Sequence, residues 1–254
     1  MLTAITRALS AEILQCELTY LTREPIDLAL AVQQHRDYQT ALRECGATVI
    51  ELPALPGMPD AVFVEDTAVV LDEIAIITRP GALSRQAETA SVAEALAVYR
   101  PLQFIREPGT LEGGDVLRVG RTLYVGLSTR TNQEGIAQLR AFTAPHGYDV
   151  QPVAVPGCLH LKTAATYLGQ QTMLANCAWV DCAAWKEFRL AHVSEAEAWA
   201  ANTLTVGETV LLAAGFPATE QQLTALGLNV RTLALSELRK AEAGLTCLSL
   251  LFES

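Results

Sequence analysis

Short runs of apolar and β-branched residues alternate along the chain with two-residue polar or glycine turns. The first example has apolar runs at 69–71 and 74–77, joined by a turn at Asp72 and Glu73. Two short apolar runs joined by a two-residue turn are the pattern of a β-hairpin. We therefore predict a hairpin here and three more of the same layout at 116–125, 166–174 and 204–212.

A helical pattern and a further β-branched run follow most of these hairpins. After the first hairpin, Ala and Val recur at helical spacing over 84–99, and a strand-like run follows at 102–105. The predicted unit is therefore ββαβ, and a unit that recurs at a fixed period indicates a repeat-built fold. Matching helix and strand segments follow the second hairpin at 132–144 and 148–153, and the fourth at 217–226 and 228–233.

One polar residue begins each unit, and the spacing of these residues is nearly constant. Asp66, Glu112, His160 and Asn202 follow one another at intervals of 46, 48 and 42 residues, and 45 more lead to Cys247. A chance match of polar residues to a loose period is the alternative reading. However, Asp, Glu, His and Cys are residue types that perform chemistry. We interpret the five positions as equivalent points of five units.

The fifth unit is incomplete, since only residues 248–252 remain for its first strand. Residues 1–6 can supply the second strand, 26–45 the helix and 47–52 the third strand, so that the two chain ends pair. The predicted fold class is α/β, a five-bladed α/β propeller of pseudo-fivefold ββαβ units, in a single domain over 1–254. Equivalent positions in such a ring point to its centre, where we expect the five polar residues to meet.

Composition supports a globular protein with an acidic surplus. Half of the residues are apolar and 18% are charged, and 18 Lys and Arg stand against 28 Asp and Glu, a formal charge of -10. A nucleic-acid backbone would require the opposite sign, whereas excess acid is compatible with drawing a small cation into a cleft. No apolar run approaches the ~20 residues of a membrane span. We expect neither a nucleic-acid partner nor a membrane.

The N-terminal segment and the cysteine usage favour a cytoplasmic protein. Arg7 and Glu12 interrupt the apolar run at the N-terminus, which therefore lacks the pattern of a secretory signal. Six cysteines in 254 residues, without a CxxC pair, predict reduced thiols, and we expect no disulfides. Cys177 and Cys182 are interpreted as buried packing residues.

Cys247 and His160 are the strongest candidates for chemistry. A thiol and an imidazole that converge with two carboxylates, Asp66 and Glu112, suggest nucleophilic catalysis on a cationic carbon centre. A free cysteine is often simply buried, and His160 alone would equally fit a structural role, so the prediction depends on their shared register. Cys158 and His160 form a C-x-H pair, but no second pair has zinc-ligand spacing, and we expect no metal.

Six segments, in order along the whole chain, resemble those of a known family. The chain is similar to the dimethylarginine dimethylaminohydrolases of the guanidine-modifying pentein superfamily. The resemblance implies hydrolysis of N-omega-methylated arginine to citrulline and a methylamine, without a metal or an organic cofactor. The segments are PDAVFVED at 59–66, ITRPGALSR at 77–85, EGGD at 112–115, STRTNQEG at 128–135, HLKT at 160–163 and GLTCLSL at 244–250.

The resemblance also implies a role for each matching residue. Cys247 would be the nucleophile and His160 the acid and base, while Asp66 and Glu112 would bind the guanidinium group. The expected partner is a small-molecule guanidine substrate, and a homodimer is a further expectation. The residues expected around the amino-acid end of the substrate are Leu18, Asp60, Glu65, Arg85 and Arg130, with the backbone carbonyl of Ala241.

Two further expectations concern how such a site would work. An ordinary thiol has a pKa of about 8.5, which neighbouring carboxylates raise, so we expect the charge of the substrate to help ionise Cys247. The stretch 8–25 is longer than a typical connection of ~4 to 6 residues. We interpret it as a lid that lowers Leu18 onto the substrate, with an ordinary surface loop as the alternative.

Three other functions fit parts of the pattern. An arginine deiminase-type hydrolase would act on unmethylated arginine or another guanidine, although relatives of that type usually carry Arg-Asp where this chain has Glu65 and Asp66. An amidinotransferase would need room for a second substrate, which a chain of 254 residues hardly offers. A propeller used only for binding would require neither Cys247 nor His160.

Overall fold

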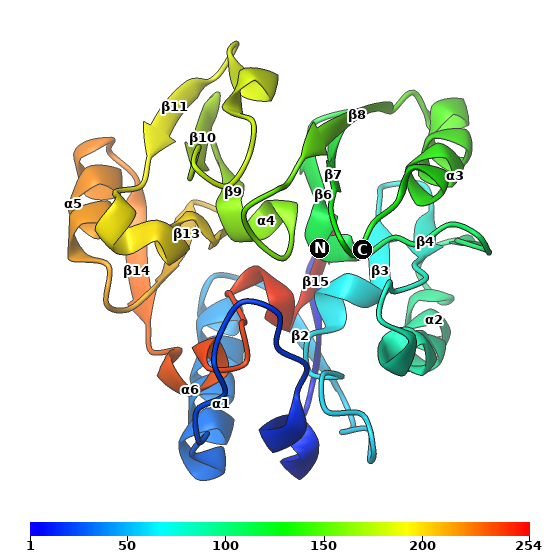
Figure 1. Cartoon of the computed structure of the whole chain (residues 1–254), viewed down its shortest axis with the longest axis horizontal. Helices are drawn as coiled ribbons and strands as arrows, with labels where there is room; N and C mark the ends of the chain where they lie inside the picture. The colour runs from blue at the N-terminus through cyan, green and yellow to red at the C-terminus, as the bar shows by residue number, and fades with distance from the viewer.

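Five three-stranded sheets are arranged in a ring in the computed structural model, which describes residues 1–254 (Figure 1). The predicted five-bladed α/β propeller is confirmed. The first two sheets contain β3 (Ala68–Val70), β4 (Ala75–Ile77) and β5 (Leu102–Phe104), then β6 (Val116–Val119), β7 (Thr122–Leu127) and β8 (Asp149–Ala154). The next two contain β9 (Ala165–Gly169), β10 (Thr172–Ala175) and β11 (Arg189–His192), then β12 (Thr203–Val206), β13 (Thr209–Ala213) and β14 (Asn229–Leu233). The fifth contains β15 (Leu250–Glu253), β1 (Leu2–Arg7) and β2 (Thr48–Leu52).

All five sheets share one topology. Two strands form an antiparallel hairpin, and the third strand joins the second in parallel. The hairpin turns are as tight as predicted, since Gly120, Gly169 and Gly207 adopt positive φ angles of 59°, 85° and 58°. Such angles suit glycine in two-residue turns. The repeat in the sequence thus corresponds to one structural unit.

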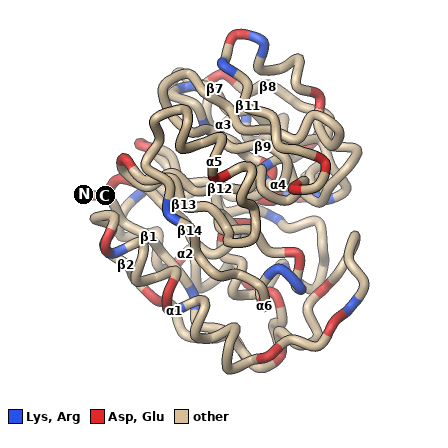
Figure 2. Tube along the Cα trace, turned by 90° about the vertical axis from the view of Figure 1, so that its left-hand side faces the viewer, with Lys and Arg blue, Asp and Glu red and all other residues tan.

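The two ends of the chain close the ring. β1 lies between β15 and β2, with Ile5 opposite Leu250 on one side and Ile50 on the other. The N-terminal amine of Met1 donates to the carbonyl of Ser254 at 3.0 Å, and both Figure 1 and Figure 2 show the termini side by side. The unit predicted to be split across the termini is confirmed.

Helices α1, α2, α3 and α5 lie on the outside of the ring (Figure 1). This position accounts for the amphipathic patterns of α1, α2 and α3. None of the helices combines the length and the apolar character that a transmembrane span requires. The α-helices are α1 (Leu28–Glu44), α2 (Thr89–Leu96), α3 (Gln133–Thr143), α4 (Leu161–Ala164), α5 (Pro217–Ala225) and α6 (Ser236–Arg239). The 3-10 helices are η1 (Ala11–Gln15), η2 (Val64–Thr67), η3 (Leu83–Glu88), η4 (Gly113–Asp115), η5 (Ala144–His146), η6 (Cys182–Trp185), η7 (Glu195–Ala201) and η8 (Thr246–Leu248).

The apolar core is divided into clusters between neighbouring elements of the ring. In one cluster, Val69 and Ile76 of the first sheet pack with Leu123 of the second sheet and Ile136 of α3.

Each unit begins with a short helical turn that carries or adjoins its polar residue. Asp66 lies in η2, Glu112 precedes η4, His160 precedes α4, Asn202 follows η7 and Cys247 lies in η8.

The third unit departs from the prediction at its cysteines. Cys177 and Cys182 form a disulfide with their Cα atoms 5.5 Å apart, so the expectation that all thiols are reduced is wrong for this pair. Cys177 is exposed and Cys182 is half-buried, so the interpretation of both as buried packing residues is also wrong. Cys177 lies in the loop after β10 and Cys182 is the first residue of η6, and the turn between them brings the two within disulfide distance without a CxxC spacing.

Candidate active site

A cavity of about 30 Å³ lies where the turns that begin the units converge. Four of its lining residues, Asp66, Glu112, His160 and Cys247, begin four different units, as the register predicted. Asn202, which begins the remaining unit, does not line it. Eight of the ten site residues proposed from sequence line this cavity, namely Asp60, Asp66, Arg85, Glu112, Arg130, His160, Ala241 and Cys247.

His160 is held between two carboxylates. Its Nε2 lies 2.5 Å from Oε2 of Glu112 and 3.8 Å from Oδ1 of Asp66. The backbone N–H of Gly114 donates to the same Oδ1 at 3.0 Å. A Cβ at position 114 would lie 2.7 Å from the imidazole and 2.8 Å from that oxygen. The glycine of EGGD therefore permits the imidazole and the carboxylate to approach the backbone this closely.

The contacts among His160, Asp66 and Glu112 favour the charged form of each of these side chains. Burial alone would lower the pKa of His160, but the charge of Asp66 and the hydrogen bond to Glu112 raise it to about 9. Burial would raise the pKa of Asp66, yet His160 and Arg85 hold it at about 2. The hydrogen bond with His160 lowers the pKa of Glu112 against the effect of burial. At neutral pH we expect a protonated imidazole between two carboxylates.

Arg85 is buried and contacts two carboxylates. Its Nη1 donates to Oδ2 of Asp66 at 2.6 Å, and its Nη2 donates to Oε2 of Glu88 at 2.9 Å. Sequence reasoning did not identify Glu88, whose pKa burial raises to about 7 despite the opposing charge of Arg85. The i,i+3 spacing of the two residues on a helical segment is the signal that could have identified it.

Asp115 is a second buried carboxylate that sequence reasoning did not identify. It accepts a hydrogen bond from the backbone N–H of Leu161 at 2.9 Å and another from the hydroxyl of Ser128 at 2.6 Å. Burial raises the pKa of Asp115 to about 6. Because it binds the first N–H of α4, Asp115 holds the turn that directly follows His160. Its place at the end of EGGD, three residues after Glu112, is the sequence signal that could have identified it.

The Cys247 thiol is half-buried in a carboxylate-rich setting. Its Sγ accepts a weak hydrogen bond from the backbone N–H of Gly244 at 3.4 Å. Burial, together with the charges of Glu65 and Asp66, raises the pKa of this thiol far above its ordinary range. We therefore expect Cys247 to be a neutral thiol at neutral pH in the free protein.

Asn202 supports the turn that carries Cys247. Its Nδ2 donates to Oγ1 of Thr246 at 3.0 Å, and its Oδ1 accepts from the backbone N–H of Thr246 at 3.2 Å. A Cβ at position 244 would lie 2.2 Å from the Asn202 side chain. Gly244 therefore leaves the space that this side chain needs to reach the turn.

Leu18 and Glu65 are the two proposed site residues that do not line the cavity. Oε1 of Glu65 pairs with Nζ of Lys162 at 2.5 Å, and its Oε2 accepts from Oγ1 of Thr246 at 2.8 Å. Glu65 and Lys162 instead line another cavity of about 510 Å³. Leu18 is half-buried and packs against the largest apolar cluster. In this structure neither side chain faces the small cavity.

Residues 8–25, here called the lid, reach the cavity through Glu17, which lines it. The backbone N–H of Glu17 donates to Oδ2 of Asp60 at 3.2 Å, and its Oε2 lies 3.6 Å from Nη1 of Arg130. Nη2 of Arg130 also donates to Oγ1 of Thr19 at 3.3 Å. The lid therefore forms part of the wall of this cavity.

The central side chains could hold a cation. One ligand atom from each of Asp66, Glu112 and His160 lies within 4.8 Å of the others, a set that could bind a metal ion. Cys158 does not extend this set, because its thiol contacts the backbone carbonyl of His160 at 3.2 Å. Paired carboxylates equally suit the N–H groups of a planar guanidinium. The arrangement thus offers a cation site beside a thiol and a proton donor.

Known proteins are similar to this chain over most of its length. The family model described as N,N dimethylarginine dimethylhydrolase, eukaryotic, matches residues 15–184. The N(G),N(G)-dimethylarginine dimethylaminohydrolase of Streptomyces coelicolor is 40% identical over 247 residues, which cover 97% of this chain and 95% of the relative. A cysteine-to-serine mutant of DDAH from Pseudomonas aeruginosa, solved in complex with citrulline, has a TM-score of 0.94 at 36% identity, with 98% of each chain covered. A histidine-to-glycine variant of dimethylarginine dimethylaminohydrolase, solved as an adduct with S-methyl-L-thiocitrulline, has a TM-score of 0.95 at 36% identity and covers 99% of this chain and 100% of that chain.

Proposed function

The chain belongs to the dimethylarginine dimethylaminohydrolase family, and we propose that it hydrolyses N-omega-methylated arginine to citrulline and methylamine or dimethylamine. The observation that supports this most directly is the convergence of Cys247, His160, Glu112 and Asp66 on one cavity. The complex with citrulline and the adduct with S-methyl-L-thiocitrulline, seen in structures of relatives, add support. Both molecules share the amino-acid part of the proposed substrate.

Substrate binding follows from the charges around the cavity. Asp66 and Glu112 bind the guanidinium N–H groups, and this places the guanidinium carbon against Sγ of Cys247. Leu18 and Glu65 lie outside the cavity walls. Leu18 acts on the substrate site through the lid, and Glu65 acts through its hydrogen bond with Thr246. The amino-acid end is assigned to Arg85 and Arg130 for the carboxylate, and to Asp60 and the carbonyl of Ala241 for the ammonium group.

The proposed reaction has two halves that share His160. When the cationic substrate binds, the Cys247 thiol loses its proton to solvent. In the first half, the Cys247 thiolate forms a C–S bond to the guanidinium carbon, and the imidazolium gives its proton to the departing methylamine as the C–N bond breaks. In the second, His160 removes a proton from water, which attacks the S-alkylthiouronium carbon. As the C–S bond breaks, the remaining hydroxyl proton passes to the departing sulfur, so that citrulline is released and the Cys247 thiol is restored. The pKa of about 9 keeps His160 protonated for the first half at neutral pH.

Cys247 in the free enzyme should react slowly with iodoacetamide at neutral pH. Only the thiolate reacts, and burial with nearby carboxylates raises the thiol pKa, so the rate constant should keep increasing above pH 8.5, the ordinary thiol pKa. Acetamidine, a small cation, should lower the apparent thiol pKa through its charge. The measurement is the pH profile of Cys247 alkylation by peptide mass, and an identical thiol pKa with and without acetamidine would contradict substrate-assisted ionisation.

Citrulline release from dimethylarginine, monomethylarginine and arginine tests the proposed activity. We expect kcat/KM for at least one methylated substrate to exceed that for arginine by tenfold or more, which corresponds to about 1.4 kcal/mol. A preference for arginine would instead identify a deiminase-type hydrolase. No citrulline from any of the three, together with no inactivation by a chloroacetamidine reagent, would identify a binding module.

Three broader proposals accompany this activity. Residues 1–254 act as one catalytic domain, which is supported by the sheet that β1 and β15 share. A homodimer remains a prediction, which sedimentation equilibrium would check. A cytoplasmic location also remains a prediction, and the disulfide between Cys177 and Cys182 removes part of the argument that led to it.

A further inference from the structure

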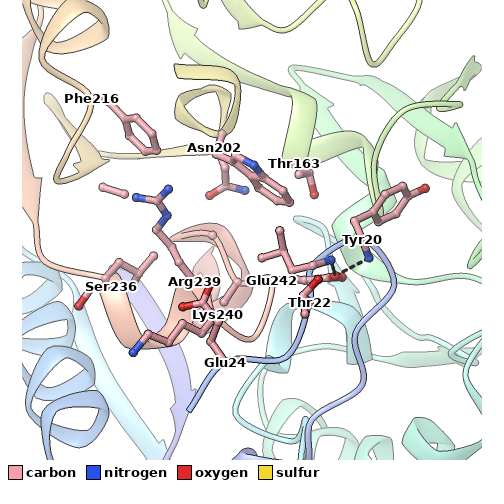
Figure 3. A pocket seen from close by; sticks show the side chains of 16 residues that line it. Tyr20, Thr22, Glu24, Thr163, Asn202, Phe216, Ser236, Arg239, Lys240 and Glu242 are labelled. Carbon is pink, nitrogen blue, oxygen red and sulfur yellow. Dashed lines mark hydrogen bonds between the residues drawn. The ribbon is translucent and has the colours of Figure 1, made fainter. Parts of the chain in front are cut away.

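Glu242 connects the lid to the segment that carries Cys247. Its Oε1 accepts hydrogen bonds from three consecutive backbone N–H groups of the lid, those of Thr19 at 2.9 Å, Tyr20 at 2.5 Å and Leu21 at 2.6 Å. Figure 3 shows the Glu242 carboxylate directed at the lid backbone beside Tyr20. Successive N–H groups that converge on one anion form a strong, charge-assisted site. One carboxylate oxygen of Glu242 thus binds the lid backbone.

The backbone of Glu242 is in a conformation that favours glycine. Its φ is +58°, and it follows α6 at the position where a left-handed residue ends many helices. The N–H of Glu242 donates to the carbonyl of Arg239 at 3.0 Å, and the N–H of Ala243 donates to that of Leu238 at 3.2 Å, the two bonds of this helix ending. Glycine would serve the fold better here, so the glutamate side chain has another use.

Glu242 also touches the catalytic cavity. Glu242, its two neighbours and Cys247 line that cavity together with Glu17 of the lid. Because Glu17 of the lid forms part of the cavity wall, a movement of the lid would change the access of substrate and water to Cys247. A closed lid excludes water from a covalent intermediate.

We propose that Glu242 is a positioning residue whose carboxylate binds the lid backbone and holds the lid closed over the cavity. Its effect on turnover rests on the proposed function, but its effect on the lid does not. Glu242 and Cys247 lie five residues apart on one short segment, so the same segment carries the thiol and binds the lid. Loss of the carboxylate should free the lid while the rest of the ring keeps its structure.

Two substitutions separate this role from a structural one. Glu242→Gly removes the carboxylate but also relieves the left-handed backbone, which offsets the lost hydrogen bonds in part, so the Tm should change little. Amide hydrogen exchange at residues 19–21 should nevertheless become at least tenfold faster, because the acceptor of these N–H groups is lost. Glu242→Gln keeps an acceptor without the charge and should give an intermediate rate. Glu24→Gln, an exposed lid carboxylate with no hydrogen bond, is the matched control and should exchange like the unmodified protein.

Activity supplies an independent readout on the same variants. KM for dimethylarginine should rise at least tenfold in Glu242→Gly with a smaller change in kcat, and iodoacetamide should reach Cys247 faster. Unchanged lid exchange in Glu242→Gly overturns the proposal, as does a lower Tm with faster exchange throughout the ring. A raised KM with unchanged exchange also overturns it, because the free Oε2 of Glu242 would then be contacting substrate directly. Amide exchange at residues 19–21 could become faster in Glu242→Gly while the unmodified protein releases no citrulline. That result would support the contact between Glu242 and the lid and would contradict the proposed function.

Discussion

Cys247→Ser should reduce kcat for dimethylarginine by ~10⁴-fold or more, because the hydroxyl is a far weaker nucleophile than a thiolate and no other thiol lines the cavity. KM should change little, since the residues that bind the substrate remain. The measurement is citrulline release under saturating substrate. Cys45→Ser replaces another half-buried free thiol, outside the cavity, and is the matched control. Activity of Cys247→Ser within tenfold of the unmodified protein would exclude the proposed nucleophile.

His160→Gln should reduce kcat by ~10³-fold, because both halves of the reaction lose their proton donor and acceptor. Glutamine still offers Glu112 a hydrogen bond, so the variant should fold. Removal of the general base slows hydrolysis of the thiouronium, and a covalent adduct on Cys247 should then accumulate. Denaturing mass spectrometry of samples quenched during turnover measures it.

The control for this variant is His146→Gln, a histidine outside the cavity, which should turn over like the unmodified protein without an adduct. Absence of an adduct in both His160→Gln and the unmodified protein, at every pH tested, would contradict the covalent route. An adduct in His160→Gln that forms on a residue other than Cys247 would contradict the assignment of the nucleophile.

The ring could be predicted from sequence because its hairpins depend on short-range signals. Two-residue turns such as Gly120-Arg121 and Gly207-Glu208 set each hairpin, and the even spacing of the hairpins indicates radial symmetry. Because the last repeat is incomplete, the ring can close only if the N-terminal segment supplies its missing strands. The disulfide of the third unit was missed because it depends on the local path of one loop, which spacing alone does not describe.

The segments that meet at the site could be predicted from sequence, but the direction of each side chain could not. The register brings Asp66 and Glu112 to the centre, but neighbouring side chains on a short helical turn point in different directions. Glu65, directly before Asp66, therefore pairs with Lys162 outside the cavity. Glu88 and Glu242 also escaped detection. Glu88 bonds Arg85 three residues earlier on the same helical turn, a spacing that the motifs did not include. Glu242 acts through hydrogen bonds to a distant segment, and no composition or period marks such a contact.

The sheet that joins the chain ends has a consequence for folding kinetics. In its register Leu2 lies opposite Glu253, which places the two partners 251 residues apart in sequence. Contacts of such separation form slowly, because the entropy of closing a long loop is lost before any contact compensates for it. We expect the four continuous units to fold first and this sheet to assemble last. Cys247 lies three residues before β15, so we expect its thiol to reach the carboxylates only in that final step.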